Sequence, residues 1–162
     1  MIGFGYDIHR MAEGESLVLA GVTIAHHSGT VAHSDGDVIY HALCDAIFGA
    51  LGQGDIGEHF PDTDLRWKNA SSDRFVEYAV ALLTNQGYSL VNIDCTLVMD
   101  TPKIKPFKQQ MRENIARLCA IPLERVNVKA TTNEGVGFIG RGEGVAAMCV
   151  CQVQSLSPSK VL

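Results

Sequence analysis

The chain has 162 residues, of which 46% are hydrophobic and 19% charged, and its formal net charge is −5. Such a chain can bury a core and is expected to form one domain. The acidic balance and the sparse Lys and Arg argue against a nucleic-acid binder, and no stretch approaches the about 20 apolar residues of a membrane span. The N-terminus does not resemble a signal peptide. The five cysteines contain no Cys-x-x-Cys pair, so we expect reduced thiols in a cytosolic protein.

Residues 2–9 alternate between two faces, as a half-buried strand does. One face carries Ile2, Phe4, Tyr6 and Ile8, and the other carries Gly3, Gly5, Asp7 and His9. Because Asp7 and His9 are two positions apart, both side chains point the same way. Residues 17–24 are predicted to form a short strand or a hairpin that bends near Gly21, followed by a polar loop over 26–29.

A helix is predicted to begin near 34–37 and to end at about Gly52. Ser34 and Asp35 are suitable N-caps, and Asp37 would lie in the first turn, where the helix dipole favours a negative charge. His41 would then lie in the second turn. A lone histidine on such a helix is usually packed or solvated, so a role for His41 depends on what lies beside it.

Two imidazoles and one carboxylate bind zinc well and can leave the fourth position open, which distinguishes a catalytic zinc from a structural one. Asp7, His9 and His41 supply this set of ligands. If the strand and the helix bring the three together, the sequence predicts a metal-assisted enzyme.

The rest of the chain continues with a loop that is either ligand-binding or a plain acidic turn, and then alternates between helices and strands. These elements are the loop 52–64, a helix from Ser71 or Ser72 to about Gln86, a strand over 89–100, a helix near 105–119, and strands over 125–132 and 144–153. The order predicts an α+β fold with helices packed on one face of a mixed β-sheet. We expect one domain over residues 1–155 and a flexible tail over 156–162.

The segment 135–140 matches the G-x-G-x-x-G pattern of dinucleotide-binding loops. That pattern requires a helix that begins in the loop, whereas an apolar strand follows here after residue 144. A Rossmann site is therefore rejected. Glu134 and Arg141 flank this loop and are candidates to hold Mg²⁺ against phosphates and to bind an oxyanion.

Six motifs stand in a particular order and spacing: Asp7-x-His9, His33 to His41, Gly54 to Gly57, Phe60 to Asp64, Asn127 to Thr132 and Gly140 to Gly144. Together they closely resemble the family of 2-C-methyl-D-erythritol 2,4-cyclodiphosphate synthases, from residue 2 to about residue 153. The resemblance implies a homotrimer with its sheets facing the threefold axis and with active sites between subunits.

The resemblance also implies a reaction in the non-mevalonate route to isoprenoid precursors. The family converts 4-diphosphocytidyl-2-C-methyl-D-erythritol 2-phosphate into 2-C-methyl-D-erythritol 2,4-cyclodiphosphate and CMP. The substrate supplies its own nucleophile, so catalysis depends on positioning and on stabilising charge. One Zn²⁺ per subunit, and Mg²⁺ or Mn²⁺ on the diphosphate, would supply part of that charge stabilisation.

Carried over by motif, the resemblance assigns Asp7, His9 and His41 to zinc, Glu134 to Mg²⁺ or Mn²⁺, and His33 and Thr132 to the phosphoryl transition state. The implied substrate contacts comprise these residues and others that bind the phosphates, the methylerythritol, the cytidine or an axial ligand. They are Asp7, Ile8, His9, His33, Ser34, His41, Asp55, Ile56, Gly57, Phe60, Pro61, Asp62, Thr63, Asp64, Met99, Asp100, Thr101, Pro102, Lys103, Ile104, Lys105, Ala130, Thr131, Thr132, Asn133, Glu134, Phe138 and Arg141.

The chain departs from the family pattern at the cytidine segment 99–105, at Asn133, where Thr is common, and at Met148, where Glu is common. Phe138 and Arg141 match a site for an isoprenoid diphosphate on the trimer axis. Two other functions stay open on sequence alone. One is a non-enzymatic trimer that binds isoprenoid diphosphates through Arg141, and the other is a zinc hydrolase with His33 or Asp55 as the base.

Overall fold

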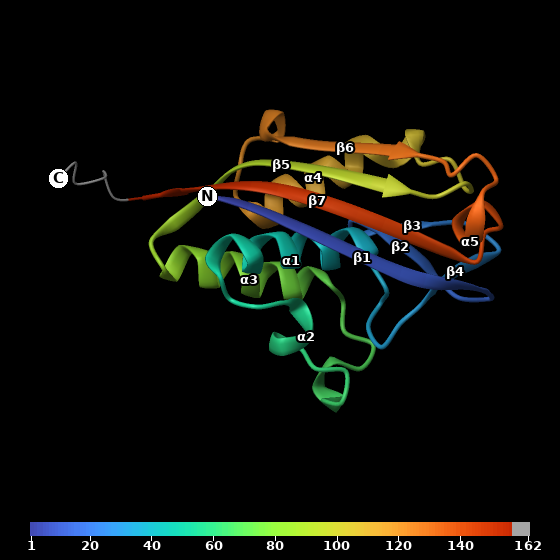
Figure 1. Cartoon of the computed structure of the whole chain (residues 1–162), viewed down its shortest axis with the longest axis horizontal. Helices are drawn as coiled ribbons and strands as arrows, with labels where there is room; N and C mark the ends of the chain where they lie inside the picture. Colours follow the sequence, from blue (N-terminus) through green and yellow to red (C-terminus); the bar gives the residue numbers. More distant parts are fainter. Residues whose placement is uncertain (157–162) are drawn as a thin grey trace.

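A computed structural model describes residues 1–156 and contains one large sheet, one small sheet and helices against the large sheet (Figure 1). The strands are β1 (Ile2–Glu13), β2 (Leu17–Leu19), β3 (Val22–Ile24), β4 (Ser28–Val31), β5 (Tyr88–Val98), β6 (Val126–Thr131) and β7 (Gly144–Ser155). The helices are α1 (Val38–Leu51), α2 (Ile56–His59), α3 (Asp73–Asn85), α4 (Lys108–Cys119) and α5 (Gly137–Gly140), with 3-10 turns η1 (Leu65–Trp67), η2 (Lys105–Phe107) and η3 (Leu123–Arg125).

The large sheet has five strands in the order β4-β1-β7-β5-β6, and β2 and β3 form a separate hairpin. Within the large sheet β5 and β6 run parallel, whereas the other neighbouring strands are antiparallel. The predicted α+β fold with a mixed sheet is therefore confirmed. Figure 1 shows α1 lying along β1 and β7 near the middle of the sheet.

Glycines on β1 allow α1 to approach the strand backbone. A Cβ atom placed on Gly3 would lie 1.7 Å from the carbonyl oxygen of Ala46, and one on Gly5 would lie 1.9 Å from that of Ala42. Both distances are far below van der Waals contact, so only glycine fits at these two positions. The next residues on this face of β1 are Asp7 and His9, and the close packing brings them beside the start of α1.

The opposite face of β1 carries large apolar side chains, which no other part of residues 1–156 covers fully. Ile2 is 71% exposed, Phe4 61%, Tyr6 47% and Ile8 39%. The alternation predicted for this strand is thus present, but its apolar face points away from the core. Met148 and Val150 on the neighbouring strand β7 extend the exposed apolar surface.

Several predicted boundaries are wrong, chiefly where a short element is held by its neighbours. Residues 28–31 form β4, paired with Arg10–Glu13 of β1, instead of the end of a polar loop. The segment 52–64 contains α2, and η1 follows it. Four residues cannot show helical or strand periodicity, so tertiary pairing decides such elements.

Two other expectations need correction at helix starts. Asp37, not Ser34 or Asp35, is the N-cap of α1, because its carboxylate accepts hydrogen bonds from the N–H groups of Ile39 and Tyr40. The glycine-rich loop contains the one-turn helix α5, which the sequence did not predict. That single turn leads at once into β7, so the rejection of a Rossmann site stands.

The five cysteines are free thiols, as expected, and all are buried. Cys149 and Cys151 share the buried face of β7, and burial raises the pKa of both thiols. Within residues 1–156 no helix is long and apolar enough to cross a membrane. β7 extends to Ser155, and the predicted tail, apart from Leu156, falls outside the described residues.

Candidate functional site

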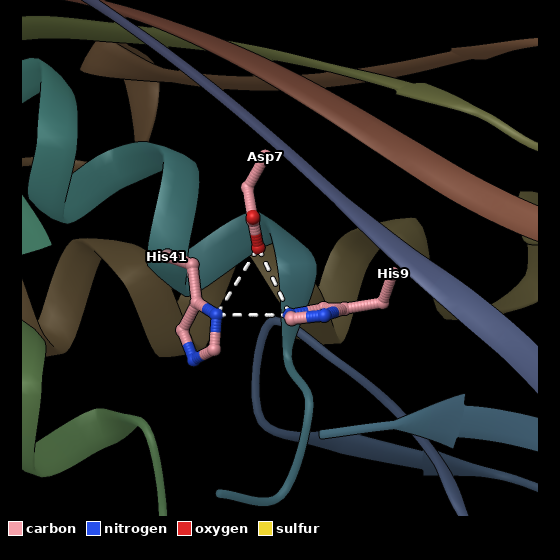
Figure 2. A group of neighbouring side chains, drawn as sticks. All are labelled: Asp7, His9 and His41. Carbon is pink, nitrogen blue, oxygen red and sulfur yellow. Dashed lines mark hydrogen bonds and ion pairs between the residues drawn. The ribbon is translucent and has the colours of Figure 1, made fainter. Parts of the chain in front are cut away.

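Asp7, His9 and His41 converge on one point between β1 and α1, and we call these three residues the metal triad. Figure 2 shows the carboxylate and the two rings pointing toward one another. Oδ2 of Asp7 lies 3.0 Å from Nε2 of His9 and 3.1 Å from Nδ1 of His41, and the two ring nitrogens are 3.0 Å apart. The three side chains come from positions 7, 9 and 41, so the fold and not local sequence brings them together.

The spacing and chemistry of the metal triad fit a tetrahedral metal ion. In a zinc site with bonds of about 2.0–2.1 Å, two ligand atoms lie about 3.3 Å apart. The triad atoms form a triangle with sides of 3.0–3.1 Å, so a small outward adjustment would admit an ion. Among the described residues, the metal triad is the one group of three His, Cys, Asp or Glu side chains close enough to hold a metal.

Electrostatics favour the ligand form of Asp7. Burial acts to raise the pKa of Asp7, but hydrogen bonds and electrostatic attraction from His41 and His9 outweigh it and lower the pKa well below its ordinary value. A carboxylate that stays ionised is the form that binds a cation.

The buried carboxylate of Asp37 fixes the start of α1 and so the position of His41. It accepts hydrogen bonds from the N–H of Ala20 at 2.9 Å and of Gly21 at 2.7 Å, in addition to its two cap contacts. Burial raises the pKa of Asp37 to about 6, while the hydrogen bonds from Gly21 and Ala20 act to lower it. Asp37 thereby ties the β2–β3 turn to the helix that carries a triad histidine.

A cavity of about 260 Å³, which we call the metal pocket, opens beside the metal triad. Its lining contains many of the predicted site residues and three that the sequence analysis missed, Ala32, Trp67 and Phe75. It is lined by His9, Ala32, His33, Ser34, His41, Ile56, Gly57, Phe60, Asp62, Trp67 and Phe75. The Nε2 atom of His33 is buried without a hydrogen-bond partner among residues 1–156, so it is available to a ligand.

Aromatic packing holds the α2 segment over the metal pocket. Phe60 packs against Phe75 with ring centroids 4.5 Å apart and against Trp67 at 5.0 Å, and His59 stacks on Phe48 at 4.0 Å. Asp55 caps α2 by accepting a hydrogen bond from the N–H of Glu58. Phe75 lies on the buried face of α3, where its pattern is that of an ordinary core residue, whereas Trp67 lies in the three-residue turn η1 and carries no periodic signal.

A second cavity, of about 340 Å³, lies between β5, β6 and the segment that leads into α4, and we call it the lysine pocket. It brings together most of the residues predicted to bind cytidine, plus Leu97 and Lys108. It is lined by Leu97, Met99, Pro102, Lys103, Ile104, Lys105, Lys108, Ala130, Thr131 and Thr132. Three lysines around an apolar floor suit a ligand that combines a flat ring with phosphate charge.

The turn after β6 is held by Asp100. Its carboxylate accepts hydrogen bonds from the N–H of Asn133 at 2.6 Å and of Gly135 at 3.1 Å. Within the turn the hydroxyl of Thr132 donates to Oε1 of Glu134 at 3.0 Å, and Glu134 adopts a positive φ of 52°. Thr132 and Glu134 are thus adjacent at the rim of the lysine pocket, on a rigid turn.

The two pockets lie toward opposite edges of the sheet. The metal pocket is built from β1 and from the segments after β4 and α1, whereas the lysine pocket is built from β5 and β6, with β7 between them. The structure therefore does not bring His33 and Thr132 into one cavity within a single chain.

The remaining predicted residues surround these pockets. Ile8 and Phe138 line a shallow cavity with His9, and Thr101 and Arg141 line another with Asp100. Arg141 pairs with Glu143, Nε to Oε1, at 2.7 Å. Pro61, Thr63 and Asp64 form the turn before η1, where Asp64 accepts a hydrogen bond from the N–H of Arg66.

The structure is a mixed-sheet α+β domain in which three side chains that could hold a metal ion stand beside one pocket, with a lysine-lined pocket toward the other sheet edge. The YgbB family model matches residues 1–154. The chain belongs to the YgbB family, and the family predicted from the motifs is confirmed.

Individual relatives agree with this assignment. The chain is 54% identical over 154 residues to a bifunctional enzyme IspD/IspF of Caulobacter vibrioides, covering 95% of this chain and 40% of that protein. It is 49% identical over 154 residues to the 2-C-methyl-D-erythritol 2,4-cyclodiphosphate synthase of Salinibacter ruber, covering 95% of this chain and 98% of that one. The chain thus spans less than half of the bifunctional relative and nearly all of the single-function one.

A solved 2C-methyl-D-erythritol-2,4-cyclodiphosphate synthase in a form bound to CDP is 38% identical, with a TM-score of 0.88. The superposition covers 95% of this chain and 100% of that chain. The likeness in structure therefore extends over nearly the whole chain.

Proposed function

We propose that this chain is a cyclising phosphorus–oxygen lyase. It converts 4-diphosphocytidyl-2-C-methyl-D-erythritol 2-phosphate into 2-C-methyl-D-erythritol 2,4-cyclodiphosphate and CMP, for isoprenoid precursors made by the non-mevalonate pathway. The observation that carries the proposal is the metal triad, placed beside the metal pocket in a chain of the YgbB family. Its full-length relative from Salinibacter ruber bears the name of this synthase.

In this reaction an oxygen of the substrate 2-phosphate attacks the β-phosphorus, the bond from that phosphorus to the bridging oxygen breaks, and CMP leaves. No protein nucleophile is required. The chain must instead fold the substrate so that two phosphates meet, and must offset their negative charge.

Asp7, His9 and His41 would hold one Zn²⁺ per subunit, because two imidazoles and a carboxylate match zinc and leave one position for a phosphate oxygen. Bound there, the ion would supply Lewis-acid stabilisation of phosphate charge. Glu134 would hold Mg²⁺ or Mn²⁺ on the diphosphate, since these hard cations prefer carboxylate and phosphate oxygens.

His33 and Thr132 would orient and stabilise the phosphoryl group in the transition state. The Nε2 of His33, which has no hydrogen-bond partner among residues 1–156, could donate to a phosphate oxygen. The hydroxyl of Thr132 now donates its single proton to Glu134 and would have to turn from it to donate to a phosphate oxygen. Ser34 would assist at the phosphate, and the metal-pocket wall from Asp55 to Asp64 would hold the methylerythritol.

The lysine pocket would hold the cytidine end of the substrate. A homologous synthase has been solved with CDP bound, and the lysine pocket offers both apolar lining and the charges of Lys103, Lys105 and Lys108. The substitutions in the segment 99–105 leave the backbone available for contacts to cytosine.

A homotrimer would unite the two pockets. His33 and Thr132 line separate cavities toward opposite sheet edges, whereas the reaction needs both, so each active site would combine the metal pocket of one subunit with the lysine pocket of the next. The exposed apolar face of β1 and β7 would then pack around the threefold axis, since exposed apolar patches of this kind mark interfaces.

Incubation of the chain with the cytidyl substrate and Mg²⁺, followed by ³¹P NMR, tests this function. We expect signals of CMP and the cyclic diphosphate, and none when the chain has been stripped of metal. Linear phosphate products would favour the zinc hydrolase instead. Binding of an isoprenoid diphosphate without turnover of the cytidyl substrate would favour the non-enzymatic binder.

A further inference from the structure

The hydroxyl of Ser72 points to the metal triad and not to the helix that it precedes. Ser72 stands at the N-cap of α3, where serine normally accepts a hydrogen bond from a backbone N–H two or three residues later, yet its side chain makes no such bond. Its Oγ lies 3.0 Å from Nε2 of His41 and donates to Oδ1 of Asp35. Ser72 is fully buried, so water does not compete for its hydroxyl.

The direction of each hydrogen bond follows from counting protons. The carboxylate of Asp35 only accepts, and it is surrounded by donors: the N–H of Ser72 at 3.0 Å, the N–H of Asp37 at 3.2 Å and the Ser72 hydroxyl. Because the Ser72 hydroxyl donates its single proton to Asp35, its oxygen can only accept a hydrogen bond from His41. In neutral His41 the Ser72–Asp35 pair therefore places the proton on Nε2 and leaves the lone pair on Nδ1, against the Asp7 carboxylate, which faces Nδ1 and favours a proton there.

Nδ1 is the nitrogen that faces the other ligands, 3.1 Å from Asp7 and 3.0 Å from His9. Ser34, whose Oγ lies 3.2 Å from Nε2 of His41, is also able to accept from the same N–H group. The Ser34 hydroxyl accepts a hydrogen bond from the N–H of Gly36 and keeps its own proton, so it can either donate to Nε2 or accept from it and does not fix the tautomer by itself.

The backbone holds Asp35 and Ser72 in place from both sides. The N–H of Asp35 donates to the carbonyl of Ala70 at 3.0 Å, and the N–H of Asn69 donates to the carbonyl of His33 at 2.8 Å. The segment before α1 and the segment before α3 are thus joined directly beside His41.

We propose that Ser72 and Asp35 are positioning residues of the metal centre, which fix the ring orientation and the Nε2–H tautomer of His41 so that Nδ1 is preorganised to bind the ion. The inference rests on the metal site of the proposed function. It adds Ser72 and Asp35 as hydrogen-bonded outer partners behind the ligand His41. Loss of such an outer partner usually weakens metal affinity by about 10–100-fold.

The test is zinc affinity in the full-length chain, measured by competition with a chromophoric chelator. Ser72→Ala should weaken zinc binding by about 10–100-fold, while Ser72→Thr, which keeps the hydroxyl, should restore most of it. The exposed neighbour Ser71 gives a matched control, and Ser71→Ala should bind zinc as the wild type does. Equal affinity in Ser72→Ala and wild type would overturn the inference.

A second readout uses the wild type alone, so it decides the question even if Ser72→Ala does not fold. Long-range ¹H–¹⁵N NMR of the zinc-loaded chain should show His41 bound through Nδ1 with its proton on Nε2, and the metal-free chain should keep the same tautomer. A metal-free His41 that carries its proton on Nδ1 would contradict the inference. A wild type that binds no zinc would instead contradict the proposed function.

Discussion

The metal pocket and the lysine pocket solve different problems in one chain. In the metal pocket the three triad atoms already lie 3.0–3.1 Å apart on a strand and a helix that pack through glycines. Beside the lysine pocket Thr132 and Glu134 are hydrogen-bonded to each other on an exposed turn, and the three lysines of the pocket lining form no ion pair with a carboxylate among residues 1–156. The three triad side chains are thus brought together within one chain, whereas the charges of the three lysines would be paired only by a ligand or by a neighbouring subunit.

This difference indicates that the proposed mechanism needs subunit assembly for the lysine pocket and not for the positions of the metal ligands. Ligand geometry is built by packing within the chain, because a metal tolerates little displacement of its ligands. Substrate charge would be met by the lysines of the lysine pocket and by the turn after β6, toward the far edge of the sheet. We therefore expect changes in the two regions to differ in their effects on bound zinc and on turnover.

The largest effect is expected at the metal triad. His41→Ala removes one of three ligands and should abolish both bound zinc and turnover, while the far-UV circular dichroism spectrum stays close to that of the wild type. Elemental analysis and the ³¹P assay measure the two losses. His27→Ala, a change in a loop histidine outside the metal triad, serves as the control. Full turnover by His41→Ala would remove the metal triad from the mechanism.

In the lysine pocket, Thr132→Ala should lower kcat by about 10²–10³-fold with little change in KM, because a donor that acts in the transition state does not bind the ground state. Steady-state kinetics separate the two parameters. Thr132→Ser keeps the hydroxyl and should recover most of kcat. A rise in KM alone would make Thr132 a substrate-binding residue instead.

Sequence patterns predicted the metal triad better than they predicted its surroundings. Alternation placed Asp7 and His9 on one face of a strand, and helical spacing placed His41 near the start of α1, so the ligands were available from local rules. Ser71 or Ser72 was expected only to begin a helix, and Trp67 was not assigned to the pocket. The role of Ser72 depends on contacts with Asp35 and His41, more than 30 positions away in the chain, which no local pattern encodes. Trp67 packs on the nearby Phe60 and Phe75, but it lies in a turn too short to show a periodic pattern.

The same limit explains the errors in the fold. The alternation of Ile2, Phe4, Tyr6 and Ile8 predicted an apolar face correctly, but it could not say that Gly3 and Gly5 would face the core. The glycines do so because α1 approaches to contact distance, as their missing Cβ atoms show. The strand β4 was missed because its pairing with β1, and not its own sequence, makes it a strand.

The exposed face of β1 provides a test of assembly. Phe4→Glu places a charge on the proposed threefold interface and should reduce the mass in solution to the 17.5 kDa of a single chain. Light scattering after size exclusion measures this mass. Leu65→Glu changes a side chain that is 79% exposed outside this face and should leave the mass unchanged. A Phe4→Glu chain that stays trimeric would show that this face is not the interface.

The buried face of β1 should respond through stability. Gly5→Ala puts a methyl group 1.9 Å from the Ala42 carbonyl oxygen and should lower the free energy of unfolding by about 3 kcal/mol, at the upper end of overpacking costs. Gly49 lies on α1, and a Cβ atom placed there would have one neighbour, the carbonyl oxygen of Phe4 at 3.8 Å. Gly49→Ala should therefore raise the free energy of unfolding by up to about 1 kcal/mol. Denaturant titration compares the two, and equal effects would contradict the close packing of α1 on β1.

The most direct test of the account is complementation between two inactive chains. His41→Ala and Thr132→Ala are produced together in one cell, purified as mixed assemblies and assayed for conversion of the cytidyl substrate. If each active site joins the metal pocket of one subunit to the lysine pocket of its neighbour, random trimers should contain intact sites and recover about a quarter of the wild-type turnover. Turnover no greater than that of the two variants assayed separately would contradict a site shared between subunits.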